Sequence, residues 1–336
     1  MALTFDTAFC RLVGIPLPIV QAPIGGLATP ELASAVSEAG GLGMLAMTWT
    51  DVEDVDAILA RMADLTDRPF GVNLILQWPQ EERLRRCLDA GARIVSFLWG
   101  DPAPLVPIAH EAGAIVMHTV GSAAEARRVV DAGVDVVVAQ GWEAGGHVWG
   151  EVATLALVPA VVDAIAPIPV VAAGGIGDGR GLAAVLALGA SAGWLGTRFV
   201  MTSETAAHPR YLELLAAAAE TSTVHLSLFD GGWPDAPHRT LRNSTVETWE
   251  AAGRPASGQR PGEGDTLATD PAGERVPRYS SVSPRAELEG DIEALSLWAG
   301  QSVGLVHDVR PIRDVIQSLA EETAAALGAA MSSVRR

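Results

Sequence analysis

The sequence contains no lysine, and all 23 of its basic residues are arginine. This absence excludes Schiff-base chemistry on a lysine and the phosphate loops that depend on one. Acidic residues outnumber basic ones 40 to 23, which gives a formal net charge of −17. Such a charge argues against nucleic acid or an anionic membrane surface as a partner.

Cysteine and long apolar runs are also scarce. Cys10 and Cys87 lie far apart and in no metal-like spacing. We therefore predict reduced, buried thiols in a cytoplasmic protein without a metal site. No apolar run reaches the roughly 20 residues of a membrane helix. The opening residues, M-A-L-T-F-D-T-A-F-C-R, lack the pattern of a signal peptide, so we expect neither membrane association nor export.

Apolar runs alternate with alanine- and charge-rich segments through the first 201 residues. Eight runs are typical of buried parallel strands, at residues 18–23, 43–47, 70–76, 94–99, 114–120, 134–140, 168–173 and 195–201. Helices are predicted from Thr29-Pro30 onward and at 51–64, 80–90, 104–112, 122–132, 155–165 and 180–188. A strand–helix unit at intervals of roughly 25 residues predicts an α/β fold, a (β/α)8 TIM barrel. A doubly wound sheet is the alternative, because strand order cannot be read from a sequence.

The regular pattern ends after residue 206. A helix at 210–220 is followed by a region rich in glycine, proline, serine and arginine at 254–285, and helices are predicted at 292–299 and 312–327. Aromatic residues in this part, including Trp233 and Tyr279, are unusual for a disordered linker. We predict a barrel of residues 1–215 and 300–336, with a cap of residues 216–299 inserted after the eighth strand. The middle of 254–285 is expected to be mobile.

The ends of the predicted strands carry small or polar residues. They are Ala22-Pro23, Asn73, Ser96, Thr119, Gln140, Gly174-Gly175 and Gly196-Thr197. Ligands of (β/α)8 barrels bind at this end, with phosphate groups after the last two strands. The segments A-A-G-G-I-G-D-G-R and W-L-G-T-R-F therefore predict a phosphate site, aided by the start of the following helix. Arg180 and Arg198 could assist, and the alternative is that each is a helix or surface arginine.

The most informative stretch is A-Q-G-W-E-A-G-G-H-V-W-G, at residues 139–150. Gly145 and Gly146 would allow close backbone approach to a flat ligand, and His147 adds a titratable nitrogen. The alternative is a glycine turn with an incidental histidine. Of the other histidines, those at 225 and 238 belong to the predicted cap and their role is open, and the remainder are expected to be structural: His110, His118, His208 and His307.

Five motifs occur in order: P-I-V-Q-A-P-I-G-G, G-V-N-L, Q-G-W-E-A-G-G-H, A-A-G-G-I-G-D-G-R with L-G-A and G-T-R-F, and A-G-Q-S-V-G-L. Together they resemble the nitronate monooxygenase family, formerly called 2-nitropropane dioxygenases. The family comprises barrels that bind flavin mononucleotide (FMN) and is related to flavin-dependent enoyl-acyl-carrier-protein reductases. The resemblance covers nearly the whole chain.

The resemblance implies a set of site residues. It implies FMN contacts at Ala22, Pro23, Ile24, Asn73, Thr119, Gln140, Gly145, Gly146, Gly174, Gly175, Gly196 and Thr197. It implies that His147 is the catalytic residue, and we predict substrate contacts at Ser96, Trp149, Gln301 and Ser302. Ile24 stands where many relatives have methionine, and Val148-Trp149 replaces a common arginine. Both departures leave the substrate open.

The implied activity is oxidation of an alkyl nitronate with dioxygen to a carbonyl compound and nitrite. His147 would remove a carbon-bound proton or stabilise the anion. The expected partners are a small nitronate or nitroalkane and dioxygen. A homodimer is the oligomeric state that we consider for this chain. Three alternatives remain: an FMN-dependent NAD(P)H enoyl-thioester reductase, a specialised biosynthetic flavin oxidoreductase, and a flavin-binding protein without turnover.

Overall fold

The computed structural model describes residues 3–334. Eight parallel strands form one sheet, in the order β1-β9-β8-β6-β5-β4-β3-β2. They are β1 (Ile19–Gln21), β2 (Gly43–Ala46), β3 (Phe70–Ile75), β4 (Ile94–Leu98), β5 (Ile115–Val120), β6 (Val136–Gln140), β8 (Val170–Ala173) and β9 (Ala192–Leu195). Leu42, just before β2, exchanges backbone hydrogen bonds with Ile19 and Gln21 of β1. The sheet is thus a nearly closed barrel, which confirms the predicted TIM barrel and excludes the doubly wound sheet.

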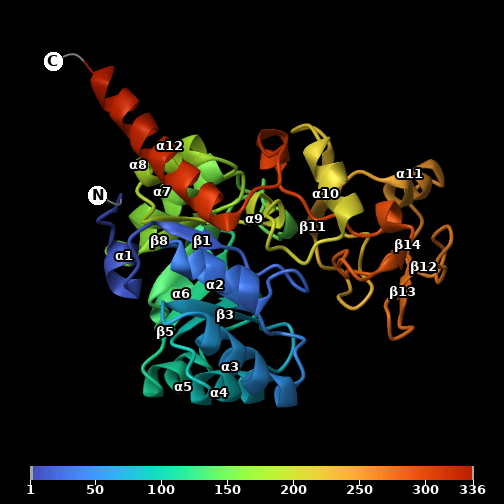
Figure 1. Ribbon diagram of the computed structural model, residues 1–336, viewed down its shortest axis with the longest axis horizontal. Coiled ribbons are helices and arrows are strands. Elements are labelled where there is room, and N and C mark those ends of the chain that lie inside the picture. Colours follow the sequence, from blue (N-terminus) through green and yellow to red (C-terminus); the bar gives the residue numbers. More distant parts are fainter. Residues whose placement is uncertain (1–2, 335–336) are drawn as a thin grey trace.

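Helices surround this sheet (Figure 1). They are α2 (Pro30–Glu38), α3 (Val55–Leu65) after the 3-10 turn η1 (Val52–Asp54), α4 (Glu81–Asp89), α5 (Val106–Glu111), α6 (Ala123–Asp131), α7 (Thr154–Ile165), α8 (Gly179–Ala187) and α12 (Ile312–Ser332). Thr29 caps α2 by accepting a hydrogen bond from the Leu32 amide, as the Thr-Pro pair predicts. The last helix, α12, packs against α8 and α2 and completes the outer ring.

The core has two layers. Inward-facing residues of the strands, such as Met44, Met117 and Val138, fill the barrel interior. A short helix, α1 (Ala8–Val13), closes the N-terminal end of the barrel with the fully buried Phe9. A second apolar layer lies between the sheet and the helices. The carboxyl ends of the strands are therefore the end at which a ligand can enter.

Two predicted elements were wrong. The eighth barrel strand ends at Leu195, and residues 197–200 form helix α9 (Thr197–Val200) rather than its continuation. Both segments are buried, and Phe199 and Val200 extend the apolar run of β9, so this short helix resembles a strand in the sequence. The helix predicted at 292–299 is only the 3-10 turn η2 (Ile292–Ala294), after which Leu297 exchanges hydrogen bonds with residues 240 and 241.

The chain between α9 and α12 forms a cap beside the barrel mouth (Figure 1). Its elements are α10 (Pro209–Ala216), β10 (Thr223–Leu226), β11 (His238–Leu241), α11 (Ser244–Ala251), β12 (Thr266–Thr269), β13 (Arg275–Pro277), β14 (Glu289–Gly290), η2 and η3 (Gln301–Leu305). Strand β11 also pairs with β7 (Gly146–His147), which belongs to the loop after β6. The domain boundaries at residues 216 and 299 stay a prediction.

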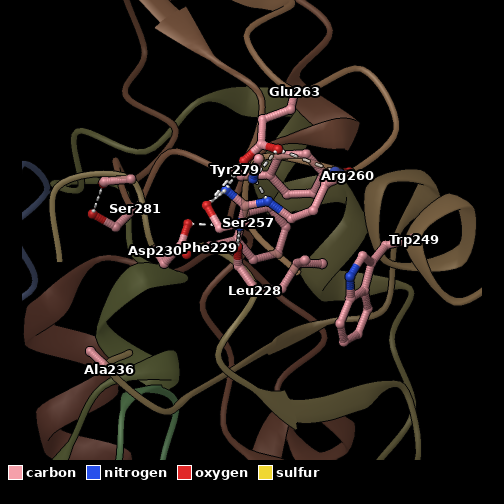
Figure 2. A network of polar contacts seen from close by, with 12 residues as sticks. Leu228, Phe229, Asp230, Ala236, Trp249, Ser257, Arg260, Glu263, Tyr279 and Ser281 are labelled. Carbon is pink, nitrogen blue, oxygen red and sulfur yellow. Dashed lines mark hydrogen bonds and ion pairs between the residues drawn. The ribbon is translucent and has the colours of Figure 1, made fainter. Parts of the chain in front are cut away.

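Arg260 organises the glycine- and proline-rich part of the cap (Figure 2). Its guanidinium donates to Asp230 at 2.8 Å and to the Leu228 carbonyl at 3.0 Å, pairs with Glu263, and lies 4.3 Å from the ring centroid of Tyr279. Because only 8% of this side chain is exposed, these contacts form a largely buried anchor. They tie the segment around Arg260 to the turn that leads into Trp233. The predicted mobility of this segment stays a prediction.

Candidate active site

A cavity of about 500 Å³, the main cavity, opens at the carboxyl ends of the barrel strands and is roofed by the cap. Most of the predicted site residues line it: Ala22, Pro23, Ile24, Asn73, Thr119, Gln140, Gly145, Gly146, His147, Gly174, Gly175, Gly196, Thr197 and Ser302. Three predicted substrate contacts, Ser96, Trp149 and Gln301, lie outside this lining. Ser96 instead accepts hydrogen bonds from the Asn73 amide through its carbonyl and hydroxyl oxygens, and so orients Asn73.

The loop that carries His147 is held between two cap segments. On one side β7 pairs with β11, with His147 opposite His238. On the other side a Cβ at Gly145 would lie 2.5 Å from the backbone of Ala299 and Gly300, so only glycine allows this approach. Gln140 donates a hydrogen bond to the His147 carbonyl at 3.2 Å. The position of His147 is therefore fixed by the barrel and the cap together.

The His147 ring is partly exposed toward the cavity, yet its Nε2 is fully buried and has no hydrogen-bond partner within residues 3–334. The ring stacks on Trp233, with centroids 4.0 Å apart and planes inclined by 28°. Burial lowers the pKa of His147 to about 3, and His238 adds a smaller contribution in the same direction. The side chain is therefore neutral near pH 7.

The cap histidines support the loop from behind. His238 places Nδ1 at 2.9 Å from the Ala236 carbonyl, while its Nε2 accepts the Phe229 amide at 3.2 Å. Both nitrogens of the neutral His238 ring therefore have hydrogen-bond partners. Burial lowers the pKa of His238 to about 4. His225 contacts the Val148 carbonyl through Nε2 at 2.9 Å. Neither ring lines the main cavity. His225 and His238, whose role the sequence left open, therefore support the loop that carries His147.

Five indoles form a tryptophan cluster above the strand ends: Trp49, Trp78, Trp99, Trp149 and Trp233. The cap residue Trp233 is 2% exposed and contacts three of them, each from a different barrel loop, at centroid distances of 4.8 to 6.2 Å. This cluster keeps water from one side of His147. The sequence motifs do not predict this cluster. A usable signal is nevertheless present, because the chain has nine tryptophans against two tyrosines and three of the tryptophans come just after strand ends.

Fewer groups are available to bind a phosphate than the sequence predicts. Asp178 caps α8 by accepting from the amides of residues 180 and 181, and Glu322 accepts the Gly179 amide, so the start of α8 is already satisfied. Arg180 pairs with Asp178 on the surface, and Arg198 pairs with Asp308. Both guanidinium groups are thus engaged by carboxylates, which favours the alternative of helix or surface arginines over a role at the phosphate.

What remains for a phosphate is the backbone of two strand ends. Gly174 and Gly175 have φ of +98° and +73°, a left-handed conformation that glycine adopts without strain. Gly196 begins α9 without a side-chain cap among the described residues, and a Cβ there would meet only the Cβ of Ala22, at 3.7 Å. Thr197 accepts a hydrogen bond from the Gly300 amide. The space beside Gly196 thus belongs to the cavity.

Metal-binding clusters and membrane-spanning helices are both absent from residues 3–334. No group of three or more histidine, cysteine, aspartate or glutamate side chains in this range is arranged to hold a metal ion. In the same range, no helix combines the length and the apolar character that crossing a membrane requires.

A sequence model of the family described as nitronate monooxygenase matches residues 6–82 and 77–322. The chain belongs to the nitronate monooxygenase family. It is 33% identical to a nitronate monooxygenase of Pseudomonas aeruginosa, over 94% of this chain and 98% of the relative. Membership makes the protein an oxidoreductase and implies a flavin cofactor.

Two other likenesses widen the range of activities. The chain is 40% identical, over 74% of its length and 69% of the relative, to a (3aS,4S,5R,7aS)-5-hydroxy-7a-methyl-1-oxo-octahydro-1H-indene-4-carboxyl-CoA dehydrogenase of Mycobacterium tuberculosis. Its structure resembles that of FabK from Thermotoga maritima with a TM-score of 0.82 and 31% identity, covering 98% of this chain and all of the other. Members of the nitronate monooxygenase family therefore have close relatives with different substrates.

Proposed function

We propose that this protein is an FMN-dependent oxidoreductase that oxidises alkyl nitronates with dioxygen to carbonyl compounds and nitrite. The observation that supports this most is His147, a neutral, stacked imidazole on the wall of a cavity whose floor is formed by glycine strand ends. A nitronate is a small anion that needs a hydrogen-bonding group but no further charged partner. The cavity lining supplies this group in His147, and its other titratable side chain, Arg285, is already paired with Glu287.

The residues present fit FMN. A Cβ at Gly146 would meet no atom within 4 Å, and Gly196 is similarly open, so a flat ring and a phosphate can approach the backbone there. Gly174, Gly175, Gly196 and Thr197 would hold the phosphate, and residues 22–24 would face the ring. When bound, the flavin supplies the redox chemistry, taking electrons from the substrate and passing them to dioxygen.

The role of His147 follows from its pKa. A general base works best when its pKa lies near the working pH, and a ring with a pKa of about 3 holds a proton poorly. The neutral ring can still donate a hydrogen bond from its N–H, and an anion bound beside it would raise its pKa. We therefore propose that a preformed nitronate is the preferred substrate and that His147 orients it, while neutral nitroalkanes react slowly.

A second candidate is oxidoreduction of a coenzyme A thioester. The relative that is 40% identical is named as a carboxyl-CoA dehydrogenase. A carbon next to a thioester carbonyl, like one next to a nitro group, carries an acidified proton, so the same histidine would suit both. The deep, tryptophan-walled main cavity is compatible with a substrate larger than a nitroalkane.

Anaerobic mixing separates these candidates. Purified holoprotein is mixed in turn with a primary nitronate, the parent nitroalkane, NADPH and a saturated acyl-CoA. Reduction of the flavin is followed by the loss of its absorbance band at ~450 nm. We expect rapid bleaching by the nitronate and slow bleaching by the nitroalkane. Bleaching by the acyl-CoA alone would support the second candidate, and bleaching by NADPH alone would contradict both.

A further inference from the structure

A second cavity, of about 490 Å³, lies outside the barrel between α6, the loop after β4 and the loop that carries His147. The residues that matter here are Trp99, Asp101, His118, Glu125, Arg128 and Trp149. Thr119 lines this cavity and the main cavity, so the two are neighbours at the end of β5. None of the proposed chemistry uses the second cavity.

The wall between the cavities is aromatic. Trp99 lies 4.7 Å from Trp149 and 4.8 Å from Trp233, measured between ring centroids. Its φ of +61° is a left-handed value that large residues rarely adopt, so the turn after β4 holds this indole in an unusual position. Trp149, which the sequence suggested as a substrate contact, faces this second cavity. A flat ring entering here would find two indoles.

His118 also lines the second cavity. The side chain is 3% exposed, and its buried Nδ1 has no hydrogen-bond partner in the part of the chain that the structure describes. Burial lowers the pKa of His118 to about 4, so the ring is neutral. A neutral imidazole nitrogen pairs best with a neutral group that can donate or accept a hydrogen bond, such as an amino-substituted heterocycle.

The charged residues of the second cavity differ in what they have left to offer. Glu125 is satisfied, because its two oxygens accept from the Trp149 indole at 3.3 Å and the Gly121 amide at 2.6 Å. Asp101 accepts the Ala103 amide through one oxygen, which leaves the other for an amine. Arg128 is exposed, and no carboxylate of residues 3–334 forms a salt bridge with it. A phosphate is the natural partner of such an arginine.

We infer that the second cavity binds the adenine nucleotide end of a co-substrate, with the base packed against the Trp99–Trp149 pair near His118 and a phosphate at Arg128. This inference rests on the second candidate of the proposed function, because a coenzyme A thioester carries adenosine 3′,5′-bisphosphate. A nicotinamide coenzyme carries the same base and is the other source of this chemistry. In either case the reactive end would extend past the tryptophan cluster into the main cavity.

The test measures binding to the holoenzyme rather than turnover. Quenching of tryptophan fluorescence and calorimetry are recorded with AMP, with adenosine 3′,5′-bisphosphate and with adenosine 2′,5′-bisphosphate. We expect saturable binding, tighter for the 3′,5′ isomer if a thioester is the co-substrate and for the 2′,5′ isomer if NADPH is. Arg128→Gln should weaken binding at least about tenfold, since one charge-assisted contact is lost.

Arg127→Gln is the matched control, because Arg127 is exposed on the same helix but does not line the cavity. It should change the affinity less than about twofold. His118→Phe should weaken AMP and both bisphosphates alike, with flavin content reporting that the variant is folded. Equal loss in the Arg127 and Arg128 variants, or no binding of any probe at millimolar concentration, would overturn the inference. Binding that persists in a protein that does not oxidise nitronates would refute the proposed function and leave this site standing.

Discussion

Replacing Trp233 by alanine should raise the pKa of His147. Burial is the main cause of the low value of about 3, and Trp233 is the side chain stacked on the ring. Its removal admits water to the imidazole and weakens the penalty on the charged form. A full return to the ordinary value of about 6.5 would raise the protonated fraction at pH 5 from about 1% to about 97%, and half of that return would protonate about a third of the molecules.

Histidine-selective NMR measures this change directly. The ring resonance of His147 is assigned by comparison with His147→Gln and titrated between pH 4 and 8 in wild type and in Trp233→Ala. We expect no titration of His147 above pH 4 in the wild type and a midpoint above about 5 in the variant. Trp233→Leu, which keeps apolar bulk over the ring, should give an intermediate value.

Trp249→Leu serves as the control for loss of a cap indole. Trp249 is half-buried in a separate apolar cluster, where its indole donates to the Pro255 carbonyl. The His147 pKa should stay low in this variant. If both variants raise it equally, general opening of the cap is the cause. If Trp233→Ala leaves it near 3, the stacking argument is refuted.

The remaining predictions concern substrate, cofactor and cap. His147→Gln should lower nitronate turnover about 10- to 100-fold while flavin content stays unchanged, since one hydrogen bond to the anion is lost but no cofactor contact; wild-type rates would remove the residue from the mechanism. Gly196→Val should fold with a melting temperature near wild type yet lose FMN, because the valine side chain would enter open cavity space. The flavin absorbance of the purified protein measures this loss, and retained flavin would place the phosphate elsewhere. Arg260→Gln should lower the free energy of unfolding by about 3 kcal/mol in urea titrations, because it leaves two partly buried carboxylates unpaired, whereas the exposed Arg275→Gln should cost under about 1 kcal/mol; equal effects would contradict the anchor.

Much of the barrel could be predicted because its signals are local. Parallel strands buried on both faces appear as short apolar runs, and caps such as Thr29-Pro30 mark where the helices begin. The same signal fails after Leu195, because Phe199 and Val200 extend the apolar run although they belong to a helical turn. Residues at the strand ends were then placed correctly around one cavity, because the carboxyl ends of barrel strands converge.

One error could have been avoided from the sequence itself. Gly174–Gly179 was read as a helix start open to phosphate, yet Asp178 stands inside that motif and aspartate is a strong N-cap residue. The structure shows its carboxylate on the amides of residues 180 and 181. A carboxylate at a helix start competes with phosphate for the same donors, so Asp178 predicts a capped start of α8 and leaves only the Gly174-Gly175 part of the motif for an anion.

The chemistry of His147 could not be predicted, because it depends on residues distant in the sequence. The motif places an imidazole of ordinary pKa in a glycine loop, which favours a general base. In the folded protein Trp233 covers the ring and His238 lies opposite it in the paired strand, and both come from the cap. Neither the short strand β11 nor a single tryptophan indicates in the sequence that it will pack against His147. The cap thereby lowers the pKa of the histidine to about 3 and changes the role that we assign to it, from removing a proton to orienting an anion.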